Sequence, residues 1–440
     1  MNSRTPPIRP VAPQAMSSAA AAVMFLCFAF AYFFSALVRA VVATLAPVFS
    51  SELGLTSADL GLLAGAYFLG FASMQLPLGS ALDRMGPKRV LLGFLSLAVI
   101  GCVLFAVARS FAGLTAARAL IGMGVSACLM APMTCYRLRF SPKAQLRAAS
   151  WMFMTGSTGM VASTLPVQWL LPALGWRGLF WLIAALFALA MAAIAWLVPH
   201  DAPAVSSASG APGQAAGGYR EVFRHPSFIR LLPMGFFHYG GLLALQSLWI
   251  GPWLSRVCGW SPQEAAQGLF ALNVGMLVTF LAWGALVPRL YSRGWTAQSL
   301  IARGLPLSLA VLVLAVALGA RATAAVWTLF CVSSTLVSLA QPAIGQAFPP
   351  ALAGRALSAY NLVIFAGVFA LQWIIGGTID LLSAAGWSAP AAFQGALSLV
   401  ALSCIASYLW FLWFDDVRER PAEIEPGARS ADNPRSCRES

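Results

Sequence analysis

Long runs of apolar residues recur along the chain and are separated by short segments that carry charge, glycine and proline. Most runs reach the roughly 20 residues that an α-helix needs to cross a membrane. The pattern predicts an all-α polytopic membrane protein with twelve transmembrane helices in two pseudo-symmetric six-helix bundles. We place these helices at 19–47, 58–80, 89–108, 112–135, 146–172, 177–198, 228–255, 262–288, 297–319, 323–346, 355–380 and 390–414.

The polar segments divide the chain into five parts. A cytoplasmic tail (1–18) precedes the first bundle (19–198), and a cytoplasmic linker (199–227) leads to the second bundle (228–414). The linker is rich in Ala, Ser, Gly and Pro, which is typical of flexible connections. The last segment (415–440) is rich in Arg, Glu and Pro, so we expect a disordered cytoplasmic tail.

The two halves resemble each other at an offset of 208 residues. Seven identities fall at the junctions of the fourth with the fifth helix and of the tenth with the eleventh. They pair Phe140, Pro142, Arg147, Ala148, Ser150, Gly159 and Ala162 with Phe348, Pro350, Arg355, Ala356, Ser358, Gly367 and Ala370. Transporters use such duplicated halves to place a site at the interface between them.

Composition removes several classes of function. The chain is 60% hydrophobic and only 9% charged, whereas soluble domains carry about 25% charged residues. The eight cysteines and three histidines show no spacing typical of a metal site, so we expect no cofactor. An ATP-driven pump would need a G-x-x-x-x-G-K-[ST] loop, and an enzyme would need a nucleophile or metal motif. Neither occurs, so we expect no enzyme.

The positive charge is distributed unevenly. Of 27 basic residues, four lie in alternate loops (Arg109, Arg177, Arg256 and Arg321) and two inside predicted helices (Arg39 and Arg118). The other 21 lie in the remaining loops and the tails. Because cytoplasmic loops are enriched in Lys and Arg, we expect both termini in the cytoplasm of a bacterium, with the chain in its inner membrane. This skew explains the basic character without nucleic acid as a partner.

The loop between the second and third helices reads Gly79-Ser-Ala-Leu-Asp83-Arg84-Met-Gly86-Pro-Lys88-Arg89. It resembles the G-x-x-x-D-R-x-G-[RK]-[RK] signature of the major facilitator superfamily, with Pro87 at a usually basic position. In helix four, Arg118-Ala-Leu-Ile-Gly122-Met-Gly124 is similar to that family's R-x-x-Q-G-x-G pattern, with Ile121 in place of Gln. The resemblance covers about residues 19–414 and implies a secondary transporter that works by rocker-switch alternating access.

The resemblance also implies a conformational latch. Asp83 would pair with a nearby arginine and cap the start of helix eleven, where a carboxylate is favoured by the helix dipole. We expect Gly79 to permit close helix contact and Gly86 a tight turn. Such a latch would favour the outward-facing state. Its members would be Gly79, Asp83, Arg84, Gly86, Arg89 and Arg355.

Arg39 and Arg118 are cations within predicted spans, where charged side chains are expensive and usually functional. Every acidic residue lies in a loop, a tail or a helix end. Arg39 therefore lacks a carboxylate at its depth, and we expect it to face a water-filled cavity and attract an anion. A helix-one arginine resembles that of the superfamily's organic-phosphate and anion:cation branches. The alternative is that Arg39 extends outward to the membrane surface.

In the superfamily, helices one, four, seven and ten line the central cavity. The resemblance therefore nominates as substrate-binding Arg39, Arg118, Tyr32, His238, Gln246 and Gln341, with Asn361 nearby. Hydrogen bonding between helices is the alternative role for the uncharged members. His238 is also a candidate proton carrier, because it alone in the spans titrates near neutral pH. We expect Gly251-Pro252 to break helix seven near its outer end.

These features predict secondary active transport of a small anionic or zwitterionic solute. The alternative is a proton-coupled exporter of lipophilic compounds and drugs. Such exporters usually carry G-x-x-x-G-P-x-x-G-G in helix five, and the stretch from Thr155 to Pro166 does not match it. Symport, exchange and uniport all remain open. We expect a monomer whose partners are the solute, membrane lipid and, if transport is coupled to them, protons.

Overall fold

The computed structural model describes residues 18–199 and 218–419. Most of both predicted tails and of the linker lies outside the described residues. The described ranges consist of helices joined by short turns and contain no strand. The apolar runs form helices because a membrane offers no partner for an unpaired backbone N–H or C=O group.

The first half contains six membrane segments built from eight helices. The fifth and sixth segments meet within α8, because Gly175 leaves the helical conformation there (φ 62°) and kinks the chain. The helices are α1 (Ser18–Glu52), α2 (Ser57–Ser73), α3 (Gln75–Met85), α4 (Pro87–Val107), α5 (Phe111–Val125), α6 (Ala127–Arg139), α7 (Pro142–Ala162) and α8 (Leu165–Leu197).

The second half repeats this plan with more irregular turns. Its seventh and tenth membrane segments contain π or 3₁₀ turns. The elements are α9 (Tyr219–Arg224), α10 (Pro226–Pro233), η1 (Met234–Tyr239), α11 (Gly240–Ala244), η2 (Leu245–Trp249), α12 (Ile250–Arg256), α13 (Pro262–Tyr291), α14 (Ala297–Leu318), η3 (Gly319–Arg321), α15 (Ala324–Ser334), η4 (Thr335–Leu339), α16 (Ala340–Ala347), α17 (Pro350–Ala384) and α18 (Ala389–Glu419).

The predicted fold class is confirmed. Eleven helices in the described ranges are long and apolar enough to cross a membrane. The segment that is not among these eleven is α7, which covers most of the predicted fifth span. The predicted fifth span, 146–172, is divided between α7 and the start of α8 by a break near Ser163 and Thr164.

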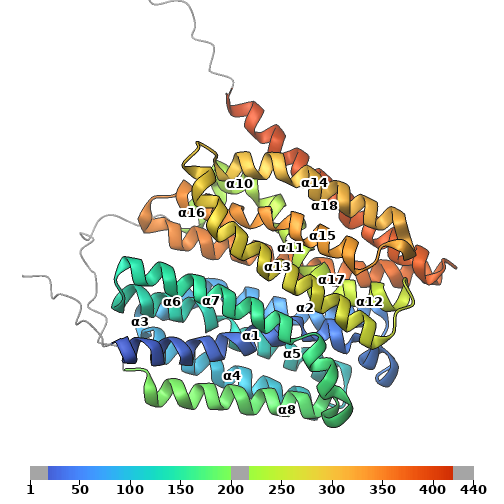
Figure 1. Cartoon of the computed structure of the whole chain (residues 1–440), viewed down its shortest axis with the longest axis horizontal. Helices are drawn as coiled ribbons and strands as arrows, with labels where there is room; N and C mark the ends of the chain where they lie inside the picture. The colour runs from blue at the N-terminus through green and yellow to red at the C-terminus, as the bar shows by residue number, and fades with distance from the viewer. Residues whose placement is uncertain (1–17, 200–217, 420–440) are drawn as a thin grey trace, which may run out of the picture.

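Figure 1 shows the two halves one above the other, with α1 to α8 below and α9 to α18 above. The described ends of the chain and of the linker lie at one end of the molecule, which we call the proximal end. The opposite end, the distal end, carries the turns after α1, α4 and α12. The two halves meet mainly where α2 packs against α17.

Glycines allow the closest helix crossings within each half. A Cβ added to Gly159 of α7 would overlap the carbonyl of Phe33 in α1, and one added to Gly367 of α17 would overlap that of Phe236 in η1. Gly159 and Gly367 are one of the pairs related by the 208-residue offset. The repeat in the sequence therefore corresponds to equivalent crossings, of helix five on helix one and of helix eleven on helix seven.

Candidate functional site

Arg39 lies in the middle of α1, and its side chain is half-buried. The side chains of Tyr32 in α1 and Tyr67 in α2 lie within electrostatic range of its guanidinium group. The ring centroid of Phe71 is 5.8 Å from its Cζ. Nε of Arg39 has no hydrogen-bond partner in the described part of the chain. Arg39 thus keeps donor capacity at the centre of the first half.

The second half contributes Tyr239, the last residue of η1, to the same place. Its side chain is half-buried and interacts electrostatically with Arg39 and Tyr32. One arginine and three tyrosines, drawn from both halves, therefore surround one point between the two bundles. We call Arg39, Tyr32, Tyr67 and Tyr239 the central cluster.

Sequence reasoning missed Tyr67 and Tyr239. Tyr67 lies on the second helix, whereas the resemblance predicted a cavity lined by helices one, four, seven and ten. Tyr239 directly follows the nominated His238. The periodicity of an apolar helix without a polar stripe did not indicate which of the two neighbours would face the other half.

Arg118, the second nominated cation, is fully buried inside the first half. Its Nη2 donates to the carbonyl oxygen of Val38 at 2.8 Å and approaches that of Arg39 at 3.5 Å. Its Cζ lies 5.0 Å from the centroid of the Tyr67 ring. Arg118 therefore holds the backbone of α1 at the point where Arg39 projects, and it contacts a member of the central cluster.

His238 lies within the second half. It is 1% exposed, and its Nε2 lies 3.3 Å from Oγ of Ser308 in α14. Ser308 also hydrogen-bonds Ser334 of α15. His238 therefore points toward α14 and α15, whereas its neighbour Tyr239 points toward Arg39.

The other nominated polar residues of the second half bind one another or close neighbours. Gln246 donates to Oδ1 of Asn273 at 3.0 Å, and Gln341 donates to Oδ1 of Asn361. Gln246 is buried, and Asn361 is 8% exposed. The structure thus groups Arg39 and Tyr32 in one cluster, with Arg118 beside it, and places these amides in separate pairs.

The motif after α2 lies beside helix eleven, because α3 packs against α17. The Asp83 side chain lies outside the described residues, so its expected cap on helix eleven stays a prediction. Gly86 ends α3 at φ 80°, which glycine adopts without strain. A Cβ on Gly79 would meet nothing described within 4 Å, so the expected close contact there is wrong.

The three arginines of the predicted latch are exposed at the proximal end. Arg84 lies in the last turn of α3, Arg89 in the first turn of α4 and Arg355 in the second turn of α17. Their positions agree with a contact between helices two, three and eleven. The pairing of Asp83 with any of them stays a prediction.

Lys88 of the same motif has a role that sequence reasoning missed. It is 4% exposed, and its Nζ donates to the carbonyl oxygens of Ala195 at 2.8 Å and Val198 at 2.6 Å. The last carbonyls of a helix lack partners within the helix. Lys88 supplies them at the end of α8 and so joins the third membrane segment to the sixth.

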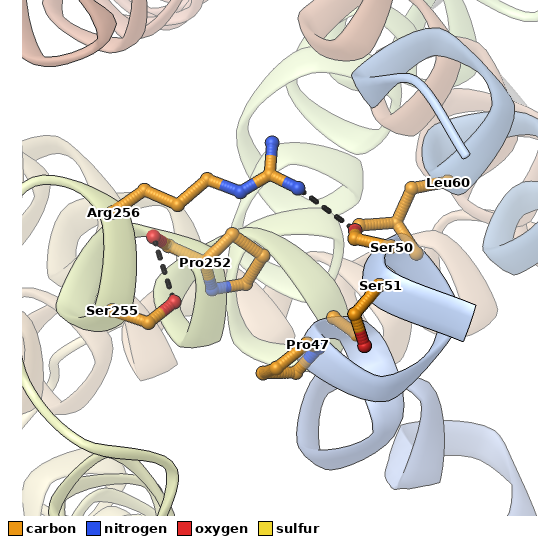
Figure 2. Close-up of a pocket in the computed structure, with 8 residues that line it drawn as sticks. Pro47, Ser50, Ser51, Leu60, Pro252, Ser255 and Arg256 are labelled. Carbon is orange, nitrogen blue, oxygen red and sulfur yellow. Dashed lines mark hydrogen bonds between the residues drawn. The ribbon is translucent and has the colours of Figure 1, made fainter. Parts of the chain in front are cut away.

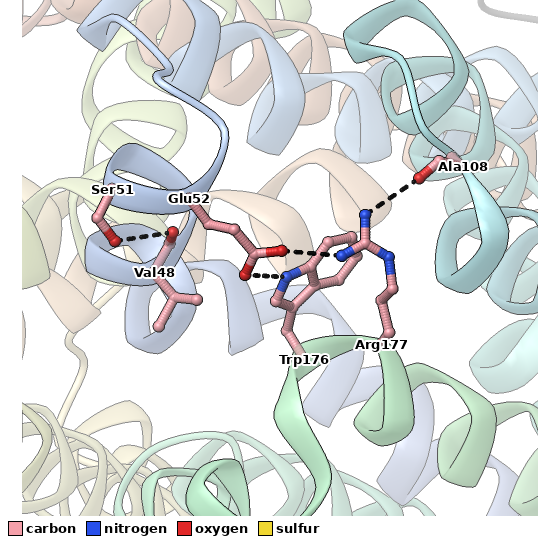
Figure 3. A network of polar contacts seen from close by, with 6 residues as sticks. All are labelled: Val48, Ser51, Glu52, Ala108, Trp176 and Arg177. Carbon is pink, nitrogen blue, oxygen red and sulfur yellow. Dashed lines mark hydrogen bonds and ion pairs between the residues drawn. The ribbon is translucent and has the colours of Figure 1, made fainter.

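A polar network orders the distal end of the first half (Figure 3). The Glu52 carboxylate accepts from Nε1 of Trp176 at 2.8 Å and pairs with Arg177 at 2.8 Å. Arg177 also reaches the carbonyl oxygen of Ala108 at 3.5 Å. Both members of the ion pair are more than two-fifths exposed, so the pair orders the turns more than it stabilises the fold.

A second set of polar contacts joins the two halves at this end. Arg256, in the last turn of α12, donates to Oγ of Ser50 at 2.8 Å, as Figure 2 shows. It also donates to Oγ of Ser57 at 3.3 Å. The Asp380 carboxylate in α17 accepts from the backbone N–H groups of Ser57 at 3.0 Å and Ala58 at 2.7 Å. A cavity of about 370 Å³ between α1 and α12 borders Arg256.

Two six-helix halves with a polar cluster between them at mid-depth define a class of protein, the helical carriers of biological membranes. The family model of the Major Facilitator Superfamily matches residues 28–371. The chain belongs to this superfamily.

The chain is 28% identical over 242 residues to the inner membrane transport protein YajR of Escherichia coli K12, covering 53% of this chain and 49% of that relative. It is 27% identical over 257 residues to the 3-(3-hydroxy-phenyl)propionate transporter of the same strain, covering 58% and 61%. The matched region therefore spans about half of the first relative and three-fifths of the second.

Among solved structures, the chain resembles an inward-facing, unoccupied bacterial homologue of the human lysosomal transporter Spinster. The TM-score is 0.73 at 17% identity, over 91% of this chain and 98% of that one. At this identity the likeness shows the fold.

Proposed function

We propose that the protein is a secondary active transporter that moves a small anionic or zwitterionic solute by rocker-switch alternating access. The observation that carries this proposal is the half-buried Arg39 between the two halves, surrounded by tyrosine hydroxyls. Every acidic residue of the sequence lies in a loop, a tail or a helix end. No carboxylate at the depth of Arg39 competes with an anionic ligand.

The chemistry of the central cluster favours a ligand with one negative charge. Arg118 is fully buried within the first half, and its Nη2 donates to the Val38 carbonyl. Of the two arginines, the half-buried Arg39 is therefore the cation that a ligand can reach. The guanidinium group binds carboxylates and phosphates through paired hydrogen bonds. The hydroxyls of Tyr32 and Tyr239 can each donate one more, whereas that of Tyr67 donates to the carbonyl oxygen of Ser35 at 3.4 Å. Because Tyr239 belongs to the second half, a bound anion would contact both bundles and could couple their movement.

Aromatic rings beside Arg39 favour an apolar body on the same ligand. Phe71 faces the guanidinium group, and its ring centroid lies 4.4 Å from that of Phe365 in α17. The relative named for 3-(3-hydroxy-phenyl)propionate transports, by that name, a carboxylate with an aromatic ring. This similarity supports an organic anion rather than an inorganic one.

The second candidate function is export of lipophilic compounds with proton coupling. The rings of Phe71 and Phe365 favour it, because they could hold an apolar drug. Arg39 disfavours it for lipophilic cations, since like charges repel at low dielectric. His238, the nominated proton carrier, is packed against Ser308 rather than beside the central cluster.

We further propose a monomer in a bacterial inner membrane, with the proximal end and both termini in the cytoplasm. The excess of Lys and Arg in the proximal loops supports this orientation. A cytoplasm-dependent fluorescent protein fused to either terminus should fluoresce. A dark fusion at either end would reverse or break this topology.

Thermal unfolding of the purified protein with a ligand panel tests the proposal. The panel contains aliphatic and aromatic carboxylates, a sulfonate, an amino acid and a lipophilic cation. A ligand at a hundredfold excess over Kd stabilises by about 2.7 kcal/mol. We expect a carboxylate to raise the Tm of the wild type and not of Arg39→Ala.

Arg109→Ala is the matched control, because it removes the same charge from an exposed turn at the distal end. It should keep the full ligand shift. The proposal fails if the anion stabilises Arg39→Ala as strongly as the wild type. A shift with the lipophilic cation alone would favour the exporter.

A further inference from the structure

Resting on the proposed transport cycle, we propose that Asp380 and Arg256 are gating residues that hold the distal side closed. Asp380, from the second half, caps helix two of the first half, and Arg256 bridges the same site. Both contacts form when the halves meet at the distal end and break when they separate there. None of the sequence motifs indicates this role.

The geometry at Asp380 is that of a helix cap supplied from outside the helix. Its two carboxylate oxygens accept from the N–H groups of Ser57 at 3.0 Å and Ala58 at 2.7 Å, the first two residues of α2. These N–H groups have no partner within the helix. The positive end of the helix dipole adds to hydrogen bonds that are already charge-assisted.

Helix two also has its own cap. Oγ1 of Thr56 accepts from N–H of Asp59, and the Asp59 carboxylate accepts from N–H of Thr56 at 3.1 Å. This capping box lies within the first half and persists whether the halves are together or apart. The Asp380 cap adds to it and depends on the distance between the halves, so it stabilises one state of the carrier rather than the helix as such.

Arg256 strengthens the same contact from α12. Its guanidinium group donates to Ser50 at the end of α1 and to Ser57 at the start of α2. In the same helix, Gly251 lies so close to Ala43 of α1 that an added Cβ would crowd the Ala43 carbonyl. The contacts of Asp380 and Arg256 therefore lie beside a tight backbone contact between the halves.

The opposite ends of the same two helices explain why this contact can act in a cycle. The second and eleventh membrane helices pack side by side and run in opposite directions. Asp83 lies near the proximal end of the second, and Asp380 near the distal end of the eleventh. If Asp83 caps helix eleven as the motif predicts, each helix carries an acid that caps the other, at opposite faces of the membrane.

Distances between spin labels at the distal end test the proposal without any substrate. Labels on Ala112→Cys and Ser388→Cys, exposed positions in the two halves, are placed in a background without native cysteines. In Asp380→Asn we expect the ratio of distal-closed to distal-open molecules to fall about 5- to 30-fold, so that a longer distance appears. Arg256→Gln should shift the ratio in the same direction.

Asp59→Asn is the matched control, since it neutralises the other acid at the start of α2 within one half. It should leave the distance distribution unchanged, and Asp380→Glu should restore it. The proposal is overturned if Asp380→Asn keeps the wild-type distribution or if Asp59→Asn shifts it equally. If Asp380→Asn does not fold, an unchanged distribution in Arg256→Gln overturns it instead.

Arg39→Ala separates this inference from the proposed function. Its distal distances should match those of the wild type without ligand, because Arg39 lies in the middle of α1 whereas Asp380 lies near the distal end of α17. If no anion binds but Asp380→Asn still changes the distal distances, only the proposed solute class is rejected. If an anion binds through Arg39 but Asp380→Asn leaves the distal distances unchanged, only the proposed gate is rejected.

Discussion

Arg39 and Arg118 carry the same charge on two helices of the same half, yet their surroundings differ. Arg39 is half-buried and faces the second half, whereas Arg118 is fully buried and donates to the Val38 carbonyl. A fully buried cation that is fixed to the backbone of α1 supports the fold, although Nε and Nη1 of Arg118 have no partner among the residues that the structure describes. A half-buried cation that faces the second half can receive a ligand. The pair therefore divides into a binding residue and a residue that positions it.

Arg118→Ala should mainly destabilise the protein. The change removes a large buried side chain and a hydrogen bond to α1, and large-to-small changes in a core cost about 2–5 kcal/mol. We expect a lower Tm in thermal unfolding, with Arg118→Lys intermediate because lysine keeps the charge but not the planar donor group. A normal Tm combined with lost anion binding would instead make Arg118 a direct ligand.

Tyr239→Phe should weaken anion binding and leave the fold intact. The side chain is half-buried and faces Arg39, and loss of one hydrogen bond to a charged ligand costs about 1.5–3 kcal/mol. Titration of the stabilising carboxylate should show Kd raised at least tenfold.

Tyr408→Phe is the control for this measurement. Its hydroxyl donates to the Ala302 carbonyl at 2.6 Å, within the second half. This variant should lower Tm slightly and keep Kd. Equal Kd values for wild type and Tyr239→Phe would remove Tyr239 from the binding site.

At the scale of elements, helix seven departs most from the expected plan. The predicted break at Gly251-Pro252 is wrong, because α12 continues through both residues. The irregularity lies earlier, in the π turns η1 and η2. Pro252 has no N–H to donate to the carbonyl four residues before it, and the wide turn of η2 lies directly before this position.

These π turns explain why His238, rather than Tyr239, was predicted to face the other half. A π turn holds more residues than an α turn, so every side chain after it is rotated relative to the 3.6-residue period. His238 and Tyr239 both lie in η1. Hydrophobic periodicity predicted the existence and limits of the helix, because these depend on length and composition. It did not predict the orientation, which depends on local hydrogen bonding.

Gly122→Ala should disrupt the crossing of α5 on α2. An added Cβ would overlap the backbone carbonyl of Tyr67, which cannot move without shifting α2. Overpacking of this kind costs about 1–3 kcal/mol. We expect a clear fall in Tm or in the yield of folded protein.

Gly79→Ala is the matched control for this change. Gly79 also belongs to a recognised motif, but a Cβ there meets nothing described within 4 Å. The variant should unfold within a degree or two of the wild type. Alanine has a higher helix propensity than glycine, so propensity alone would raise the Tm of both variants. Equal destabilisation by both changes would therefore show that the crossing at Gly122 does not set the cost.

At the scale of the whole molecule, the sequence predicted the architecture more completely than it predicted the residues of the site. The apolar runs, the repeat at 208 residues and the loop motif each indicated two six-helix halves, and the structure has them. Arg39 was identified because an isolated charge inside an apolar helix is visible in a sequence. Asp380 was not, because its partners are backbone N–H groups more than 300 residues away.

The position of Arg39 has an electrical consequence for a carrier of this kind. A site that is open to one side of the membrane takes the potential of that side, so the positive charge of an empty site senses the membrane voltage. One elementary charge changes in energy by about 2.3 kcal/mol per 100 mV. An inside-negative voltage would therefore favour the empty carrier facing the cytoplasm, and a bound monoanion would cancel this preference.

Imposed potassium diffusion potentials in proteoliposomes would measure the effect. We expect voltage to change the rate of net anion flux and to leave one-for-one anion exchange unaffected, because in exchange only the neutral, loaded site reorients. Equal voltage dependence of both modes would mean that a further charge moves with Arg39. If only net flux responds to voltage, Arg39 makes the membrane potential, rather than an ion gradient, a control on which side the empty carrier faces.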